Sequence, residues 1–242
     1  DTVNKKICER AFYYCGSLTE VDFGNAVTSI GDYAFTVCSK IKSLEFPDSL
    51  TSIGQFAFSP YTDGTGGTYK ESNLESVKFG TGLKTIGNYA FYDDRKISKL
   101  EFTDKLTSIG SYAFYNCGNL QSIAIPDNVT KIDNNTFENC SSLKSVSIGK
   151  SCTTISATAF NNATALEKIT VSADNEKYSS VDGALLNKEK TSIILYPKSK
   201  SGEFVIPDTV TSIADRAFSS CSNLTKITIG ANVESVGDYA FN

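Results

Sequence analysis

Histidine, tryptophan and methionine are absent from this 242-residue sequence. The missing histidine removes the general base of Ser–His and Cys–His nucleophile pairs, and it removes the commonest metal-binding side chain. Carboxylate chemistry remains, but the acidic residues form no pair outside the repeat described below. We therefore expect a protein that is not an enzyme and that holds no metal and no cofactor.

Long hydrophobic runs and CxxC pairs are missing as well. No apolar run approaches the ~20 residues of a membrane-spanning helix, and no signal segment opens the chain. Without a CxxC pair, the seven cysteines support neither a zinc ribbon nor a redox motif. A net charge of −4 and a pI near 5.0 provide no basic surface. We expect no nucleic-acid partner and no direct insertion into a membrane.

The sequence does contain an internal repeat with a period of 23 residues. Phenylalanine marks this period, with one longer gap between Phe58 and Phe91 and another between Phe160 and Phe218. The phenylalanines on this period are Phe12, Phe35, Phe58, Phe91, Phe114, Phe137, Phe160, Phe218 and Phe241. Self-similarity at one fixed period is the signature of a repeat architecture, in which each unit packs on its neighbours.

Other apolar residues keep fixed distances from each phenylalanine, and the unit reads L-x-x-I-x-I-P-x-x-V-T-S-I-G-x-x-A-F-x-x-C-x-x. The I-x-I part alternates with a period of two and predicts a short strand with one buried face. V-T-S-I is a second short extended segment, and the following glycine permits a sharp bend. The A-F stretch is too short for a long helix and predicts one helical or 3₁₀ turn. Stacked coils would bury the apolar residues in ladders of like residues.

Three segments carry a family resemblance: SIGDYAFTVC, SIGSYAFYNC and SIADRAFSSC. Each is followed by a leucine and an I-x-I strand, and over essentially its whole length the chain resembles the BspA-type bacterial leucine-rich repeat. The resemblance implies an α/β-type repeat solenoid. This is a right-handed leucine-rich-repeat coil with a short parallel strand per repeat and short helical or 3₁₀ turns on the other side. We predict a single solenoid over residues 1–242, with about nine coils.

Two interruptions of the repeat are predicted. Residues 59–72 form an insertion rich in glycine, threonine and serine, which is typical of a surface loop. Residues 172–203 are similar to the family's extended repeat, in which a hairpin interrupts the coil. The residues themselves favour the same structure, because Ala184–Asn187 and Thr191–Tyr196 are apolar segments on either side of a short polar turn.

Five cysteines share one position, three residues after the phenylalanine. They are Cys15, Cys38, Cys117, Cys140 and Cys221. One interpretation is a buried, small apolar thiol that faces the core. The alternative is a set of disulfides between neighbouring coils, which a strand spacing of ~5 Å does not forbid. The odd number of cysteines argues against a complete disulfide framework.

An aromatic series is the first candidate for partner binding. Most of its members lie two residues before a phenylalanine and one directly follows a phenylalanine; they are Tyr33, Phe56, Tyr89, Tyr112 and Tyr115. Rows of aromatic side chains can dock a protein partner or stack on sugar rings. Alternatively, the rings cover the outer face of the repeat itself and leave their hydroxyls in water.

A charged series in the middle of the I-x-I strands is the second candidate. Its members are Asp22, Glu45, Lys78 and Glu101. In many solenoids this face of the sheet binds partners. The partly alternating signs also suit a charge ladder that compensates itself on a solvated face.

Members of the family that the chain resembles are often bacterial cell-surface adhesins. The resemblance therefore implies a non-enzymatic protein-binding or adhesion module, extracellular or on the cell surface, with a protein or glycan on host or neighbouring cells as partner. One alternative is a structural spacer or a head-to-tail assembly unit. No capping sequence is visible at the ends, so we expect either a piece of a longer chain or self-association through uncapped ends. Another alternative is an accessory domain of a secreted hydrolase.

Overall fold

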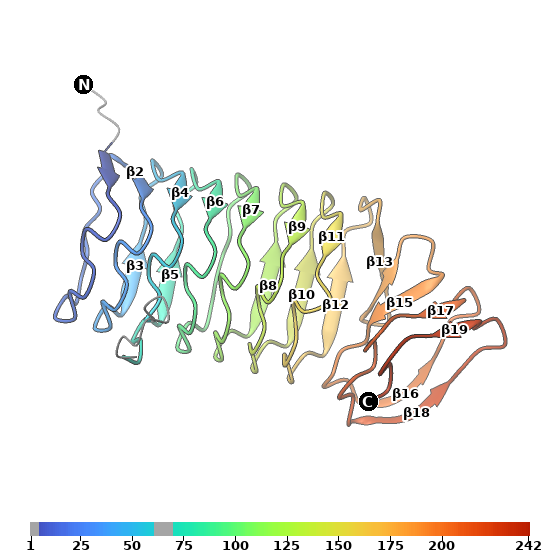
Figure 1. Cartoon of the computed structure of the whole chain (residues 1–242). Coiled ribbons are helices and arrows are strands. Elements are labelled where there is room, and N and C mark those ends of the chain that lie inside the picture. The colour runs from blue at the N-terminus through green and yellow to red at the C-terminus, as the bar shows by residue number, and fades with distance from the viewer. Residues whose placement is uncertain (1–4, 61–69) are drawn as a thin grey trace.

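The computed structural model describes residues 5–60 and 70–242. Over these residues the chain winds into an LRR-like solenoid of about ten turns. Each regular coil places a V-T-S-I segment on one side and an I-x-I segment on another, so two rows of strands run along the molecule (Figure 1). Most of the insertion predicted at residues 59–72 falls outside the described residues.

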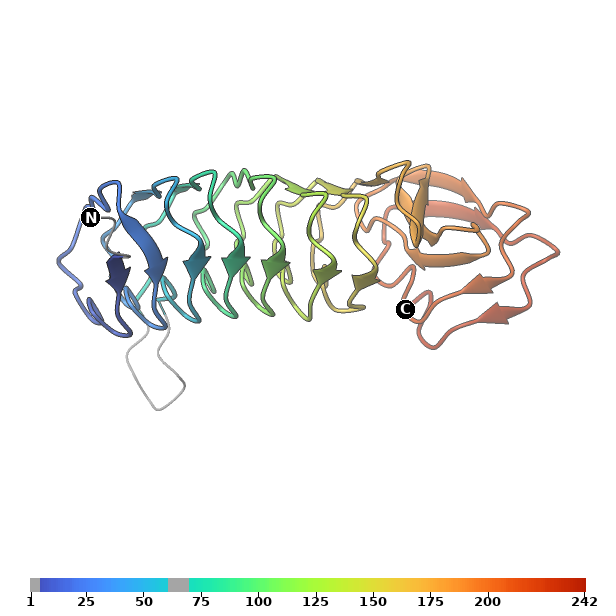
Figure 2. The same ribbon diagram turned by 90° about the horizontal axis from the view of Figure 1, so that it is seen from above.

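The V-T-S-I segments form the first row of strands, all parallel (Figure 2). Before the hairpin these strands are β1 (Lys5–Ile7), β2 (Val27–Ile30), β4 (Ser52–Ile53), β6 (Thr85–Ile86), β7 (Ser108–Ile109), β9 (Lys131–Ile132) and β11 (Thr154–Ile155). Their register sets isoleucine on isoleucine, for example Ile86 beside Ile109. The predicted ladder of like residues is confirmed here, because a fixed repeat length brings the same position of each coil into register.

The I-x-I segments form the second row, also parallel. The strands are β3 (Ser43–Glu45), β5 (Ser76–Lys78), β8 (Ser122–Ile125), β10 (Ser145–Ile148), β12 (Lys168–Val171), β16 (Gly202–Val205) and β18 (Leu224–Thr228). In β8 the isoleucines are buried and the residues between them are exposed. This alternation is the expected one for a strand with one face toward the core.

An antiparallel hairpin interrupts the coils within residues 172–203. Strand β13 (Tyr178–Val181) pairs with β14 (Ala184–Asn187), and β14 pairs with β15 (Ser192–Leu195). Strand β15 then continues the parallel row through β17 (Ser212–Ile213) to β19 (Ser235–Val236). The strands after the hairpin lie at an angle to those of the earlier coils (Figure 1).

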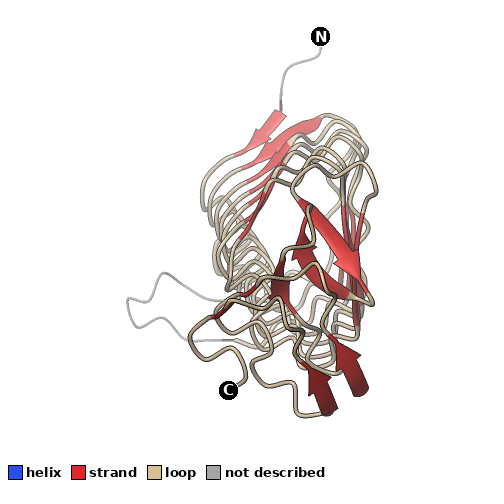
Figure 3. Ribbon diagram, turned by 90° about the vertical axis from the view of Figure 1, so that its right-hand side faces the viewer, coloured by secondary structure: helices blue, strands red, loops and turns tan. Residues whose placement is uncertain are grey.

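The turns that contain the A-F motif are not helical, and the prediction of short helical or 3₁₀ turns is wrong. Residues 5–60 and 70–242 contain strands, turns and loops but no helix (Figure 3). Around Phe114, both Tyr112 and Asn116 adopt left-handed backbone, with φ of 58° and 59°. The Phe114 N–H consequently donates to the carbonyl of Thr136 in the next coil at 3.0 Å, whereas the Tyr115 N–H donates to Tyr112 within its own coil. A helical turn would keep its backbone hydrogen bonds inside one coil. The hydrogen bonds that join each A-F turn to the next coil would then be lost.

Stacked phenylalanine rings fill the centre of the solenoid. The rings of Phe91 and Phe114 lie 5.3 Å apart with 3° between their planes, and Phe137 continues the stack at 5.7 Å from Phe114. The core consists of two clusters of buried residues that meet near the hairpin. In the second cluster Tyr196 takes the place of the phenylalanine and stacks on Phe218 at 4.9 Å.

The cysteines are free thiols, and all seven lie within the described residues. Where the shared position is buried, the thiol donates to the carbonyl of the phenylalanine one coil earlier. Cys38 reaches Phe12 at 3.1 Å, and Cys140 reaches Phe114 at 3.3 Å. Burial raises the pKa of Cys140 to about 12. This agrees with the interpretation of these residues as buried small thiols rather than as halves of disulfides.

Candidate partner-binding site

The two predicted series lie on different faces of the solenoid. The aromatic series belongs to the wall of stacked A-F turns, and the charged series belongs to the I-x-I strands and the segments in line with them. The structure therefore brings the aromatic residues together with one another but not with the charged residues. Within the described part of the chain, no group of three or more metal-binding side chains is present. No helix there is long and apolar enough to span a bilayer.

The aromatic residues two positions before each phenylalanine form one continuous stack. Tyr33 and Phe56 lie 5.1 Å apart, Phe56 and Tyr89 lie 4.4 Å apart, and Tyr89 and Tyr112 lie 4.7 Å apart. The planes of each pair are within 10° of parallel. The guanidinium of Arg10 extends this row, because it lies over the ring of Tyr33 at 5.1 Å.

A second, shorter row runs beside the first. Tyr92 and Tyr115 stack at 4.7 Å with 3° between their planes. Tyr92 also contacts Tyr89 at 5.6 Å, and Tyr115 contacts Tyr112 at 5.7 Å. These four rings, Tyr89, Tyr92, Tyr112 and Tyr115, form a two-by-two array that we call the tyrosine platform. Tyr92 directly follows Phe91 in the sequence, as Tyr115 directly follows Phe114.

The four tyrosines of the platform are half-buried. Burial raises the pKa of Tyr89, and the neighbouring Tyr112 adds to this effect. Burial is also the main cause of the raised pKa of Tyr115, with the carboxylate of Glu138 contributing. The phenols of Tyr89 and Tyr115 therefore stay neutral at physiological pH. The platform presents apolar ring edges together with phenol hydroxyls, a group that can both donate and accept hydrogen bonds.

The local backbone does not favour tyrosine in the first row. Tyr89 and Tyr112 have φ of 57° and 58°, and the equivalent position one coil later is Asn135, with φ of 58°. A left-handed conformation costs an ordinary residue roughly 1–2 kcal/mol, and asparagine tolerates it better. Stacked aromatic pairs contribute about 0.5–1.5 kcal/mol beyond the area they bury, which offsets this cost. Ring stacking, rather than backbone preference, accounts for the tyrosines at these positions.

The charged series forms local interactions on its own face of the solenoid. The ammonium of Lys78 contacts the carboxylate of Glu45, which raises the pKa of Lys78. Glu101 pairs with Lys99 at 2.6 Å, and Asp22 accepts a hydrogen bond from the Gly24 N–H at 2.8 Å. The ion pairs are largely exposed, and exposed pairs contribute little to stability. This pattern matches a self-compensating ladder.

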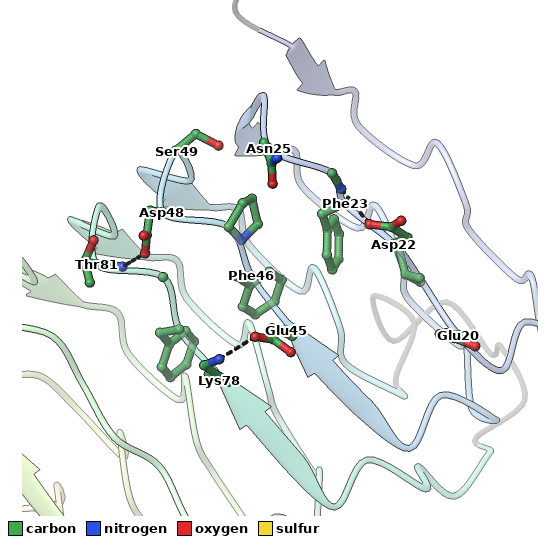
Figure 4. A pocket seen from close by; sticks show the side chains of 15 residues that line it. Glu20, Asp22, Phe23, Asn25, Glu45, Phe46, Asp48, Ser49, Lys78 and Thr81 are labelled. Carbon is green, nitrogen blue, oxygen red and sulfur yellow. Dashed lines mark hydrogen bonds and ion pairs between the residues drawn. The ribbon is translucent and has the colours of Figure 1, made fainter.

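An open groove of about 860 Å³ lies where this face meets the turns that follow β3 and β5 (Figure 4). The buried rings of Phe23, Phe46 and Phe79 form its floor. Asp48 lies at its edge and accepts a hydrogen bond from the Thr81 N–H at 2.7 Å, which lowers the pKa of Asp48. The groove brings three of the four predicted charged residues together: Asp22, Glu45 and Lys78. Because all three already have partners within the chain, the tyrosine platform is the stronger candidate for a binding surface.

Comparison with known proteins identifies the family of this repeat. The family model of the BspA type leucine rich repeat region matches the chain in six copies, over residues 5–63, 66–181 and 194–242. No curated protein matches the sequence.

Two solved structures are similar over most of the chain. A leucine-rich repeat protein from Eubacterium ventriosum is 31% identical, with a TM-score of 0.68, and the match covers 88% of this chain and 56% of that one. A leucine rich cell surface protein from Faecalibacterium prausnitzii is 27% identical, with a TM-score of 0.63, and the match covers 99% of this chain and 67% of that one. The chain thus spans little more than half the length of the first of these relatives.

Proposed function

Because this chain belongs to the BspA-type leucine-rich-repeat family, we propose that it is a non-enzymatic binding or adhesion module of a secreted or cell-surface bacterial protein. Its partner is a protein or a glycan on a host cell or a neighbouring cell. The name of the Faecalibacterium prausnitzii relative, a leucine rich cell surface protein, supports the location. The tyrosine platform supports the binding role.

The observation that carries this proposal is the grouping of four half-buried tyrosines on one face. Tyrosine provides a large contact area at low conformational entropy cost, and it is enriched in protein interfaces and paratopes. The rings hold one another in place through stacking, so they are ordered before a partner arrives. Pre-ordered side chains lose less entropy on binding than mobile ones. The edges and hydroxyls suit both protein and sugar surfaces.

The repeat itself suggests variants that remove the rings with little disturbance of the fold. Asparagine occupies the position of Tyr112 one coil later, at Asn135, and serine occupies the position of Tyr92 one coil earlier, at Ser59. We therefore choose the double variant Tyr112→Asn with Tyr92→Ser. The matched control is Tyr14→Asn, since Tyr14 is exposed, has left-handed backbone and lies outside the platform.

The test is binding to matrix-protein and glycan arrays, followed by affinity measurement on each partner found. We expect the wild-type chain and the Tyr14→Asn control to bind alike, and the double variant to bind at least about tenfold more weakly, since a buried anchor contributes about 2 kcal/mol. Circular dichroism checks that all three are folded. If no array partner is found, or if the double variant binds as tightly as the wild type, the proposal is wrong.

A further inference from the structure

The extended repeat leaves a cleft of about 570 Å³ in the wall of A-F turns. One side of the cleft is the turn at residues 156–161 that follows β11, and the other side is the turn at residues 214–219 that follows β17. Strands β14 and β15 lie between these two turns in the chain and contribute Leu185, Ile194 and Leu195 to the lining. We call this space the hairpin cleft.

The hairpin cleft coincides with a break in the phenylalanine stack. Phe160 stacks on Phe137 at 5.8 Å, and Tyr196 stacks on Phe218 at 4.9 Å, but in the described residues no ring contact joins Phe160 to Tyr196. The apolar residues at this break are Leu185, Ile194 and Leu195, and they line the cleft. Leu185 is buried, whereas Ile194 and Leu195 remain partly exposed. The cleft thus has an apolar surface that the chain itself does not cover.

A backbone donor also lacks its acceptor there. In the preceding coil the Phe137 N–H donates to the carbonyl of Ala159 at 2.9 Å. The equivalent N–H of Phe160 has no acceptor among residues 5–60 and 70–242, because no regular turn follows in the next coil. Phe160 is itself buried and lines the cleft. A buried N–H without an acceptor is unfavourable, and a ligand that supplies an oxygen atom would satisfy it.

Lys198 places a positive charge at the same cleft. Its side chain is half-buried, and it has no ion pair or side-chain hydrogen bond within the described part of the chain. Burial lowers the pKa of Lys198, while Cys221 and Glu138 act in the opposite direction. Three other charged residues, Asp215, Arg216 and Asp238, also line the cleft, and two of these side chains have partners within the chain. The guanidinium of Arg216 lies over the ring of Tyr239 at 5.8 Å, and Asp215 accepts the Asp238 N–H at 2.8 Å.

We propose that the hairpin cleft binds a small amphiphilic carboxylate. The carboxylate accepts hydrogen bonds from the Phe160 N–H and the Lys198 ammonium, and the apolar body of the ligand covers Ile194 and Leu195. The volume lies within the range of about 300–1,000 Å³ found for small-molecule sites, which are mostly apolar with a few convergent polar groups. A fatty acid and the carboxyl terminus of an apolar peptide share this chemistry. The site is separate from the tyrosine platform and does not depend on the function proposed for it.

Isothermal titration of the full chain with two carboxylates tests the proposal. Decanoate, below its micellar concentration, represents a fatty acid, and acetyl-leucyl-leucine represents a peptide terminus. Decyltrimethylammonium has a similar apolar body with the opposite charge. We expect at least one carboxylate to bind with one site per chain and decyltrimethylammonium to bind at least tenfold more weakly. The tighter of the two carboxylates identifies the source of the ligand.

Two lysine variants locate the binding site. Lys198→Gln removes the charge at the cleft, and Lys144→Gln removes an exposed lysine elsewhere. We expect Lys198→Gln to weaken carboxylate binding by about tenfold or more, as for the loss of a charged hydrogen-bond partner, and Lys144→Gln to leave it unchanged. Thermal melts check that both variants are folded. Absence of carboxylate binding, equal binding of the cationic amphiphile, or equal binding by Lys198→Gln and the wild type would overturn the proposal.

Discussion

Replacement of Asp94 by cysteine is expected to stabilise the protein, and the gain is expected to grow as the pH rises. Asp94 is fully buried at the position that Cys117 and Cys140 occupy in the next two coils. Neither oxygen of its carboxylate has a hydrogen-bond partner in the described part of the chain. Burial raises its pKa well above the ordinary value; the nearby hydroxyl of Ser72 opposes this shift, and the carboxylate of Asp93 adds to it. Asp94 therefore occupies a position that suits a neutral side chain.

The sign and size of the effect follow from the raised pKa. Below the ordinary aspartate pKa of about 3.9, the folded and unfolded states both hold the proton, and there is no penalty. Between that value and the raised folded pKa, the unfolded chain releases the proton while the folded chain keeps it. The free energy of unfolding then falls by up to about 1.4 kcal/mol for each pH unit. Cysteine at this position does not titrate in that range, so the free energy of unfolding of Asp94→Cys does not fall in this way.

Thermal and urea unfolding of the wild type and Asp94→Cys between pH 4 and pH 8 measures this difference. At pH 7 we expect the variant to be more stable by about 2 kcal/mol or more, since a buried polar group without a partner costs about 1–3 kcal/mol. For a chain of this size, that corresponds to a rise in Tm of about 4–8 °C. The control Asp104→Cys changes an exposed aspartate and should show no such pH-dependent gain. A variant that is less stable at pH 7, or a gain that does not increase with pH, would refute the reasoning.

Two further predictions concern the packing of the coils. Gly110→Ala should destabilise the protein by about 1–3 kcal/mol in urea melts, because the added Cβ would lie 2.5 Å from the backbone nitrogen of Asn88. Gly118→Ala is the control, since its Cβ would meet no atom closer than 3.7 Å, and an equal loss for both would contradict the explanation. Phe114→Ala should cost about 3–5 kcal/mol by the same assay, as is typical for a large buried aromatic side chain, and Phe12→Ala should cost clearly less.

The ladders of the solenoid could be predicted from the sequence, whereas the conformation of its turns could not. A fixed period requires equivalent residues to stack, so the rows through Ile86 and Phe91 follow directly from the spacing. The A-F stretch has a length that suits either one helical turn or two successive tight turns. The choice between them depends on hydrogen bonds to the next coil, such as that from Phe114 to Thr136, and a single repeat unit contains no sign of them.

Of the two proposed sites, only the tyrosine platform could be predicted from the sequence, because only its residues recur with the period of the repeat. The aromatic row was visible as a periodic series, and the structure shows that Tyr92 lies beside it. The hairpin cleft was not visible, because it results from a turn that the extended repeat omits. Its key features are an N–H without an acceptor at Phe160 and an unpaired ammonium at Lys198, and neither belongs to a motif.

In this molecule, side chains at regular positions of the repeat mostly form their bonds with neighbouring coils. Lys78 and Glu45 stand at equivalent positions of neighbouring coils and pair with each other, and the buried thiol of Cys140 bonds to the coil before it. Groups with unused binding capacity arise where a coil departs from the pattern. Tyr112 ends its stack because the next coil has Asn135, and Phe160 lacks an acceptor because the next coil has a hairpin. Recognition of a small ligand requires groups that the solenoid has not already satisfied, and the hairpin cleft lies at such a departure.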